Sequence, residues 1–339
     1  MSRKAFDYSG ISTIEINGPI NLLERIADNM EREIIESSNP DCRIHINQSE
    51  NPAEIKKDKR FEYLTINKSR TEEQPIIKYT RYNTLVRTIH QKSPNNYKVD
   101  TNVAMDEASG LICIRNHLSN HPRLAQYPLL HASLINIDGR GILIPGNSRQ
   151  GKTALTVYLL QECKAGFVSD ENVMLDINRE SIVGLYIPRT PRVRFSTIVE
   201  SGLSNVLEDI RIANATQYID SDAIERIIDT RSFHVDAGIA FSRKAFCNLL
   251  GTNSRESSYI NMVLFPKYKE SGNLNVRTLK LEEGVQRLSK TGLIKKSDID
   301  PKELQETTVS FEPYKFRDFD FVEVEFSGVE NLGQGGFRL

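Results

Sequence analysis

Two spaced glycines followed by a lysine and a threonine are the residues of this chain best suited to chemistry. Residues 146–153 have the sequence GNSRQGKT and match the pattern G-x-x-x-x-G-K-[ST] at every position. Glycines let such a loop curl so that several backbone N–H groups point at one phosphate, and the dipole of a following helix adds positive potential. The pattern therefore predicts a P-loop. Its expected phosphate-binding residues are Gly146, Asn147, Ser148, Arg149, Gln150, Gly151, Lys152 and Thr153.

The last two residues of this loop have separate expected roles. Lys152 would reach the β- and γ-phosphates of a nucleoside triphosphate, and the Thr153 hydroxyl would be a ligand of Mg²⁺. A glycine turn with an exposed lysine is the alternative interpretation. An apolar run before the loop and a helix-forming run after it favour the P-loop, because a P-loop joins a strand to a helix. Arg149 and Gln150 are bulkier than the residues usual inside such loops.

Asp170 and Glu171 form an acidic pair after the apolar run GFVS, which follows the expected helix. In a parallel sheet, the carboxyl end of the neighbouring strand lies beside the P-loop. Two acids at that place suit the binding of Mg²⁺ and the acceptance of a proton from an attacking hydroxyl. The alternative is a polar Ser-Asp-Glu-Asn turn exposed to water. Because the P-loop fixes the position of the pair, we favour the functional interpretation.

A histidine and three arginines are further candidates. His131 opens the run LLHASLINI, and a lone histidine at a strand start is by itself more often structural than catalytic. Arg189, Arg192 and Arg194 follow two prolines, and guanidinium groups neutralise phosphate charge. A basic loop paired with surface acids is an equally good interpretation of the arginines. Arg192 and Arg194 are the favoured pair, because alternate residues of an extended segment lie on one side.

The elements expected to position these residues form a strand-loop-helix-strand unit in residues 129–175. This order brings the loop to the carboxyl end of a buried strand, where the phosphate sites of α/β sheets lie. Apolar runs predict further strands at 181–187 and 260–266. Helical spacing predicts helices at 221–229 and 281–290.

The first part of the chain has a different pattern. Residues 21–35 place apolar side chains at helical spacing, and short β-prone runs then alternate with Pro, Asn, Ser and Gly. The runs expected to be strands are 61–66, 75–80, 84–91, 97–105 and 110–116. We therefore expect a β-rich α+β accessory domain at 1–116, an α/β domain at 117–312 and a C-terminal tail at 313–339.

Composition limits the class of protein. The 339 residues carry a formal net charge of −1 with 26% charged and 39% hydrophobic residues, as expected of a globular protein without a nucleic-acid partner. Four cysteines occur singly, and no apolar run is long enough to span a membrane. These features predict a cytoplasmic protein with reduced thiols and no membrane partner. They leave open whether the chain forms a homo-oligomer.

The run from His131 to Gly146, together with Gly151-Lys152-Thr153 and Ser169-Asp170-Glu171, resembles the core of the HPr kinase/phosphorylase-like family. That family shares its nucleotide-binding core with phosphoenolpyruvate carboxykinase. The resemblance covers residues 131–175 and, more weakly, 187–194. It implies an α/β P-loop kinase core in the domain 117–312, with ATP and Mg²⁺ as its nucleotide and metal. It also implies that Asp170 is the general base, Glu171 helps to coordinate Mg²⁺, and His131 lies near the transferred phosphate.

This chain departs from the family pattern at three points. Glu171 stands where the family usually has Asp, Ala132 stands where Gly is customary, and the glycine-rich segment that docks HPr is not found. The resemblance therefore implies a kinase that acts on a hydroxyl other than that of HPr. A serine of a protein or peptide, as in peptide natural-product pathways, and a small-molecule alcohol are the expected acceptors. Phosphorylase activity is left open.

Two other classes of protein remain as alternatives. A nucleotide-binding regulator would bind the triphosphate without transferring phosphate, and the unusual residues Arg149, Gln150 and Glu171 add weight to it. An NTP hydrolase or transport motor is the second alternative. The short strand that ends in two acids argues against a motor, because motors carry their Walker B acid after a long apolar strand.

Overall fold

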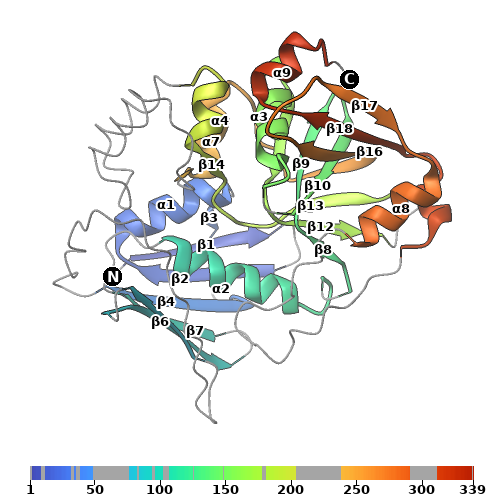
Figure 1. Cartoon of the computed structure of the whole chain (residues 1–339). Coiled ribbons are helices and arrows are strands. Elements are labelled where there is room, and N and C mark those ends of the chain that lie inside the picture. The colour runs from blue at the N-terminus through green and yellow to red at the C-terminus, as the bar shows by residue number, and fades with distance from the viewer. Residues whose placement is uncertain are drawn as a thin grey trace. The chain divides into compact units, whose positions relative to one another are not determined.

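The computed structural model of the chain consists of two compact units. It describes residues 2–8, 12–31, 34–35, 39–48, 76–81, 84–93, 96–101, 107–124, 126–147, 149–177, 181–203, 238–290, 311–337 and 339. Described residues up to Gln126 form the first unit, and those from Tyr127 onward form the second. Both units combine helices with strands (Figure 1), so the predicted α/β class is confirmed at the level of a mixed α/β protein.

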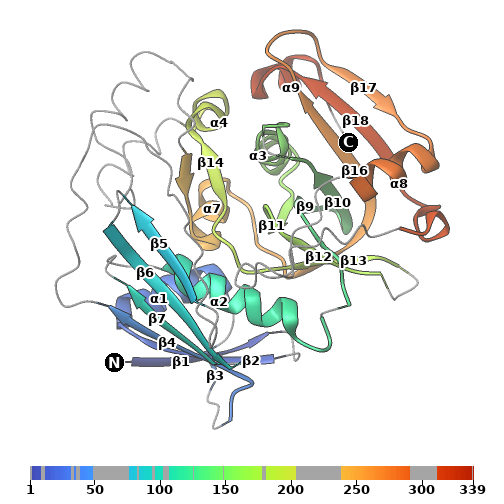
Figure 2. The same cartoon turned by 60° about the horizontal axis from the view of Figure 1, so that its bottom comes forward.

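The first unit is a seven-stranded sheet in the order β3-β1-β2-β4-β7-β6-β5. Helices α1 and α2 pack beside each other on this sheet (Figure 2). Alternate residues of β2 and β4 are buried, among them Ile14, Ile16, Ile44 and Ile46, as expected of strands with one face on a core. The elements are β1 (Ser2–Tyr8), β2 (Ser12–Gly18), α1 (Ile20–Met30), β3 (Ile34–Ile35), β4 (Cys42–Gln48), β5 (Ile76–Arg81), β6 (Thr84–Ser93), β7 (Asn96–Thr101) and α2 (Glu107–Asn120).

Residues 110–116, predicted to be a strand, lie inside helix α2, so that prediction is wrong. Polar side chains occupy buried positions of this helix, so its buried face does not appear in the sequence as apolar residues at helical spacing. Asn116 donates from Nδ2 to the Tyr97 hydroxyl at 2.7 Å, and His117 Nε2 lies 2.8 Å from the Ser12 hydroxyl. The predicted domain boundary at residue 116 therefore falls within α2.

The other predictions for the first unit have mixed outcomes. The predicted helix at 21–35 is confirmed as α1, but it ends at Met30, where Glu31 adopts a left-handed conformation with φ of 45°. Predicted strands at 75–80, 84–91 and 97–105 correspond to β5, β6 and β7. The predicted strand at 61–66 lies outside the described residues.

The second unit is built around a nine-stranded sheet. Its order is β11-β9-β10-β16-β13-β12-β8, and β18 pairs with both β16 and β17. Strands β14 and β15 pair with each other in a separate two-stranded sheet. The strands of the unit are β8 (Leu129–Leu130), β9 (Ala132–Ile137), β10 (Arg140–Pro145), β11 (Gly166–Ser169), β12 (Val173–Asp176), β13 (Val183–Tyr186), β14 (Arg192–Arg194), β15 (Gly238–Ala240), β16 (Ser257–Tyr268), β17 (Asn275–Thr278) and β18 (Asp320–Phe326). The helices are α3 (Lys152–Glu162), α4 (Phe195–Glu200), α7 (Arg243–Leu249), α8 (Leu281–Lys290), the 3₁₀ helix η2 (Pro313–Phe316) and α9 (Val329–Gln334).

The strand that carries the acidic pair is not the direct neighbour of the strand before the loop, contrary to expectation. Strand β9 lies between β10 and β11 and is antiparallel to both. β10 and β11 are therefore parallel to each other, one strand apart, and their carboxyl ends lie at the same edge of the sheet. The intervening strand contributes its own side chains to that edge.

The remaining predictions for the second unit are largely confirmed. The predicted strand-loop-helix-strand unit at 129–175 corresponds to β9, β10, α3 and β11, and a short turn at the acidic pair separates β11 from β12. The strand at 260–266 lies within β16, the strand at 181–187 contains β13, and the helix at 281–290 is α8. The predicted helix at 221–229 lies outside the described residues.

The segment 313–339, predicted to be a tail, belongs to the core of the second unit. Strand β18 pairs with β16 along its whole length, and Phe321, Val324 and Phe326 are buried. The alternation of Phe and Val with acidic residues in this segment is the period of a half-buried strand. Within the described part of the chain, no helix is long and apolar enough to cross a membrane.

Candidate functional site

The loop between β10 and α3 is a tight turn that its own residues hold closed. The Gln150 side chain accepts a hydrogen bond from the Asn147 N–H at 2.7 Å, and the Gln150 N–H donates to the Asn147 carbonyl at 3.3 Å. Arg149 adopts a left-handed conformation with φ of 70°. The bulk of Gln150 is thus used to brace the turn. Ser148 lies outside the described residues.

Gly151 is required where the loop enters helix α3. Its φ is 89°, which side chains rarely adopt, and a Cβ atom at this position would lie 2.6 Å from Cζ of Phe326. The preceding residue is tied to the end of β16, because the Tyr268 N–H donates to the Gln150 carbonyl at 3.1 Å. Strands β16 and β18 therefore fix the path of the loop.

The first turn of α3 begins at Lys152 without a side-chain cap. Its leading N–H groups have no partner within the helix and are a source of positive potential. Lys152 is only 5% exposed, and Thr153 is half-buried in the same turn. The carbonyl of Lys152 accepts a hydrogen bond from Thr156 at 2.9 Å.

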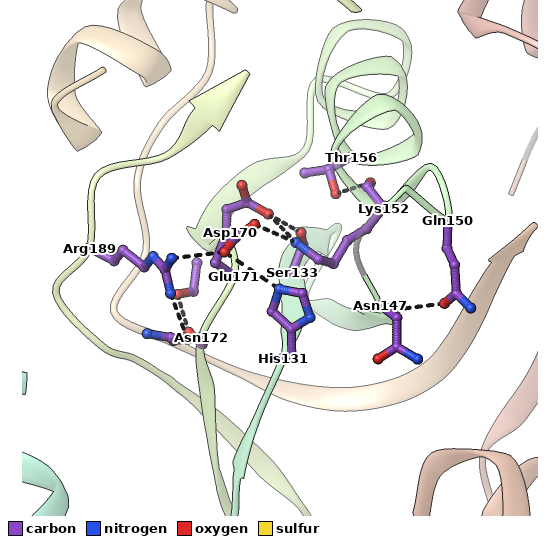
Figure 3. A network of polar contacts seen from close by, with 11 residues as sticks. His131, Ser133, Asn147, Gln150, Lys152, Thr156, Asp170, Glu171, Asn172 and Arg189 are labelled. Atoms are coloured by element: carbon purple, nitrogen blue, oxygen red, sulfur yellow. Dashed lines mark hydrogen bonds and ion pairs between the residues drawn. The ribbon is translucent and has the colours of Figure 1, made fainter. Parts of the chain in front are cut away.

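Lys152 lies over both acids at the end of β11 (Figure 3). Its Nζ atom is 3.3 Å from Oδ1 of Asp170 and 3.5 Å from Oε1 of Glu171. Ser133, on the intervening strand β9, donates a hydrogen bond to Oδ1 of Asp170. Among the described residues, Oδ2 of Asp170 has no hydrogen-bond partner, and the side chain of Asp170 has no exposed surface.

Glu171 is the more accessible acid, with 26% of its side chain exposed. Its Oε2 atom lies 2.9 Å from Nη2 of Arg189 and 3.5 Å from Nε2 of His131. Burial would raise the pKa of Glu171, but the His131 hydrogen bond and the charges of Lys152 and Arg189 hold it well below its ordinary value. Glu171 therefore stays ionised at neutral pH.

The backbone at the acidic pair is held in an unusual conformation. Glu171 has a φ of 69°, a left-handed value that is uncommon for a residue other than glycine. The Asn172 N–H donates to the Asp170 carbonyl at 2.9 Å, which closes a tight turn around Glu171. The Asn172 side chain accepts a hydrogen bond from Nη1 of Arg189 at 3.2 Å, and its buried Nδ2 atom has no partner within the described ranges.

The structure brings five of the sequence candidates together. His131, Lys152, Asp170, Glu171 and Arg189 form one connected network (Figure 3). The favoured arginines, Arg192 and Arg194, lie in β14, which pairs with β15.

Sequence reasoning did not identify Ser133 and Asn172 as site residues. Ser133 stands two positions after His131 on a strand, so the two share a face, and this spacing was a usable signal. Asn172 carries no comparable signal, because its role depends on the turn around Glu171.

The oxygen atoms at this site are of the kind that Mg²⁺ prefers. The described residues contain no group of three or more His, Cys, Asp or Glu side chains arranged to hold a metal. Mg²⁺ usually binds through one or two carboxylates and completes its shell with water and phosphate oxygens. The carboxylate of Glu171, which is 26% exposed, fits that kind of site, and Thr153 offers a hydroxyl.

Comparisons with known proteins give distant structural similarity alone. No family model matches the chain, and no curated protein sequence matches it. Among solved structures, the chain is similar to the HPr(Ser) kinase/phosphatase from Coxiella burnetii, with 11% sequence identity over 59% of this chain and 85% of that chain. The TM-score is 0.26, so the finding is a distant structural relationship and carries no conclusion about activity.

Proposed function

We propose that this protein is a kinase that transfers the γ-phosphate of ATP to a hydroxyl group. One observation carries the proposal. The ammonium group of Lys152, at the start of α3, lies 3.3 Å and 3.5 Å from the two carboxylates that end β11. A positive group that suits phosphates and an acid that suits a hydroxyl proton are the two parts that phosphoryl transfer requires side by side.

The loop at 146–153 is the proposed P-loop of this kinase. The uncapped N-terminus of α3 offers N–H groups to the phosphates, and Lys152 adds a full positive charge. Phosphoryl transfer depends mainly on position and on neutralisation of charge. The hydrogen bonds that Gln150 makes within the loop and to β16 support this role, because a braced loop does not have to be ordered when the nucleotide binds.

Asp170 is the proposed general base, and Ser133 is the residue that orients it. Oδ1 contacts Ser133 and Lys152, whereas Oδ2 has no partner in the part of the chain that the structure describes. Oδ2 is therefore the atom that would take the hydroxyl proton. Lys152 covers the carboxylate, so movement of its ammonium from the acids to phosphate oxygens would open Asp170 to the acceptor. Mg²⁺ held by Thr153 and Glu171 would supply charge neutralisation to the transferred phosphate.

Arg189 and His131 are the proposed neutralising groups on the accessible side of the acids. Both contact the same oxygen of Glu171, and Arg189 is 37% exposed. A guanidinium group in this position suits the negative charge that spreads over a phosphoryl group during transfer. Arg192 and Arg194 stay predicted phosphate-binding residues.

The proposed acceptor is a serine of a protein or peptide, or a small-molecule alcohol. The test uses ATP labelled at the γ-phosphate, a serine-containing peptide library and a mixture of small alcohols. Wild-type protein should label an acceptor, and Asp170→Asn should reduce labelling by a factor of about 100 or more while nucleotide binding persists. Asp138→Asn is the control, because Asp138 is an exposed acid at the opposite end of the β9–β10 hairpin. If Asp170→Asn labels the acceptor at the wild-type rate, Asp170 is not the general base.

A non-catalytic nucleotide-binding regulator is the second candidate function. The observation that favours it is the complete burial of the Asp170 side chain beneath Lys152. A regulator would bind Mg-ATP through the loop and order a partner surface without any transfer. The same labelling experiment separates the two functions, because a regulator leaves no labelled acceptor although it binds the nucleotide.

A further inference from the structure

Two strands that run parallel to β10 end beside the loop on the side away from the acids. The strand order is β11-β9-β10-β16, and β18 pairs with the far side of β16. Strand β16 is parallel to β10, and β18 is parallel to β16, so the carboxyl ends of all three strands share the sheet edge where the loop begins. Tyr268 is the last residue of β16 and lies in register with Phe326, the last residue of β18.

Tyr268 is an exposed aromatic residue in direct contact with the loop. The residue is 41% exposed, whereas Phe326 beneath it is buried. The two rings meet edge to face with centroids 5.9 Å apart. The Tyr268 N–H donates to the Gln150 carbonyl, and the Tyr268 Cβ atom lies 3.3 Å from the position that a Cβ of Gly151 would occupy.

The backbone that carries Tyr268 is fixed on both sides. The Lys269 N–H donates to the Phe326 carbonyl at 2.9 Å, and Lys267 is 2.9 Å from Oε2 of Glu325 on the neighbouring strand. Lys269 pairs with the other oxygen of Glu325. An exposed aromatic ring on a braced strand end loses little freedom when a ligand packs against it.

The proposed function, on which this inference rests, fixes the orientation of the triphosphate relative to the loop. If Lys152 holds the β- and γ-phosphates, the γ-phosphate faces Asp170 and Glu171 on the β11 side of the loop. The sugar and base must then leave the loop on the other side, over the ends of β16 and β18. Ligands of α/β sheets bind at the carboxyl ends of the strands, which is where Tyr268 stands.

We propose that Tyr268 is the stacking surface for the nucleobase of the bound triphosphate. A base is a flat π surface, and stacking on an aromatic side chain is tolerant of base identity because every base has such a face. Phe326 packs against the Tyr268 ring from below, and the exposed surface of Tyr268 is accessible to the ligand. We therefore expect Mg-ATP and Mg-GTP to be bound with similar affinity.

The test compares Mg-ATP with Mg-tripolyphosphate, which has the phosphates and no base. In calorimetric titrations, Tyr268→Ala should weaken binding of Mg-ATP about tenfold or more and change binding of Mg-tripolyphosphate less than about twofold. Tyr268→Phe should bind both ligands as wild type does, because it keeps the ring. Tyr259→Ala is the matched control, since Tyr259 is a 56% exposed tyrosine near the opposite end of the same strand.

Each other outcome contradicts the inference in a distinct way. Unchanged Mg-ATP binding by Tyr268→Ala would show that the base lies elsewhere. An equal loss of both ligands would show that Tyr268 supports the loop and not the base, while phosphate binding by the loop would stand. Wild-type protein that binds neither ligand would overturn the proposed function and this inference with it.

Discussion

At the level of single residues, the charged side chains at the end of β11 stabilise one another. Asp170 and Glu171 each carry a negative charge, and Lys152 and Arg189 supply the two positive charges that face them. Because Lys152 and Asp170 are almost completely buried, neither charge is well solvated by water. The removal of either partner leaves the other in an unfavourable environment.

Lys152→Met should destabilise the protein even in the absence of nucleotide. The substitution leaves the Asp170 carboxylate buried, with Ser133 as its one remaining partner among the described residues. Loss of one member of a buried ion pair costs about 3 kcal/mol or more. Urea unfolding followed by circular dichroism measures the change. The double variant Lys152→Met/Asp170→Asn should regain part of the loss, because no charge is then left buried. An unchanged unfolding midpoint in Lys152→Met would contradict the buried pair.

Glu171 should make stability depend on pH in the acid range. Its folded pKa lies below the ordinary value of 4.5, because the neighbouring positive groups outweigh burial. The stabilisation is therefore present above pH 4.5 and is lost as the pH falls toward the folded pKa. Thermal unfolding of wild type and Glu171→Gln from pH 7 to pH 3 measures it. The difference between the two midpoints should be largest near neutral pH and shrink on acidification, and a constant difference would argue against the shift.

The residues of the site were partly predictable from the sequence. The glycine pattern identified Lys152, and the order of elements placed Asp170 and Glu171 near it. Arg189 was not preferred over Arg192 and Arg194, because the choice depends on the turn at Glu171 that aims the acid toward it. Such a turn is a property of the packed structure and has no simple sequence pattern.

At the level of elements, a helix or strand was predictable where its apolar residues recur at regular spacing. The unit from β9 to β11 was predicted well, because its strands are short apolar runs and its helix follows a glycine pattern. Helix α2 was missed because buried Asn116 and His117 interrupt its apolar stripe. The insertion of β9 between β10 and β11 was also missed, since pairing order is not visible in a local pattern.

Two glycines with similar backbone angles allow a matched test of the loop. Gly139 has a φ of 88° and open space around it, whereas Gly151 has a φ of 89° and faces Phe326. Gly139→Ala should lower the free energy of unfolding by about 1–2 kcal/mol from backbone strain alone. Gly151→Ala should cost about 2–4 kcal/mol, because overpacking adds to the strain, and it should also abolish nucleotide binding. Equal effects of the two substitutions in urea unfolding would argue against the close contact with Phe326.

The molecule as a whole consists of two units, and the second depends on the end of the chain. Strand β18 lies between β16 and β17 in the sheet, and its buried residues face both sides of that sheet. Val324 and Phe326 pack in one core cluster with α3, and Phe321 packs in the other with α8. The end of the chain is thus structural in the unit that carries the site.

Deletion of residues 313–339 should prevent the second unit from folding. The deletion exposes two core clusters and leaves β16 with an unpaired edge, which favours aggregation. Solubility and the cooperativity of thermal unfolding are the measurements. Deletion of 338–339 alone is the control, because Leu339 is exposed, and it should leave both properties unchanged. A soluble, cooperatively folded product of the long deletion would contradict the role of β18.

The most direct test of the central claim is a crystal structure of the protein with Mg²⁺ and a non-hydrolysable ATP analogue. We predict that the β-phosphate lies against the N–H groups at the start of α3, with the γ-phosphate facing Asp170 and Glu171. We also predict that the Lys152 ammonium lies within hydrogen-bond distance of phosphate oxygens. A triphosphate bound at any other place, or a bound triphosphate that Lys152 does not contact, would contradict the claim.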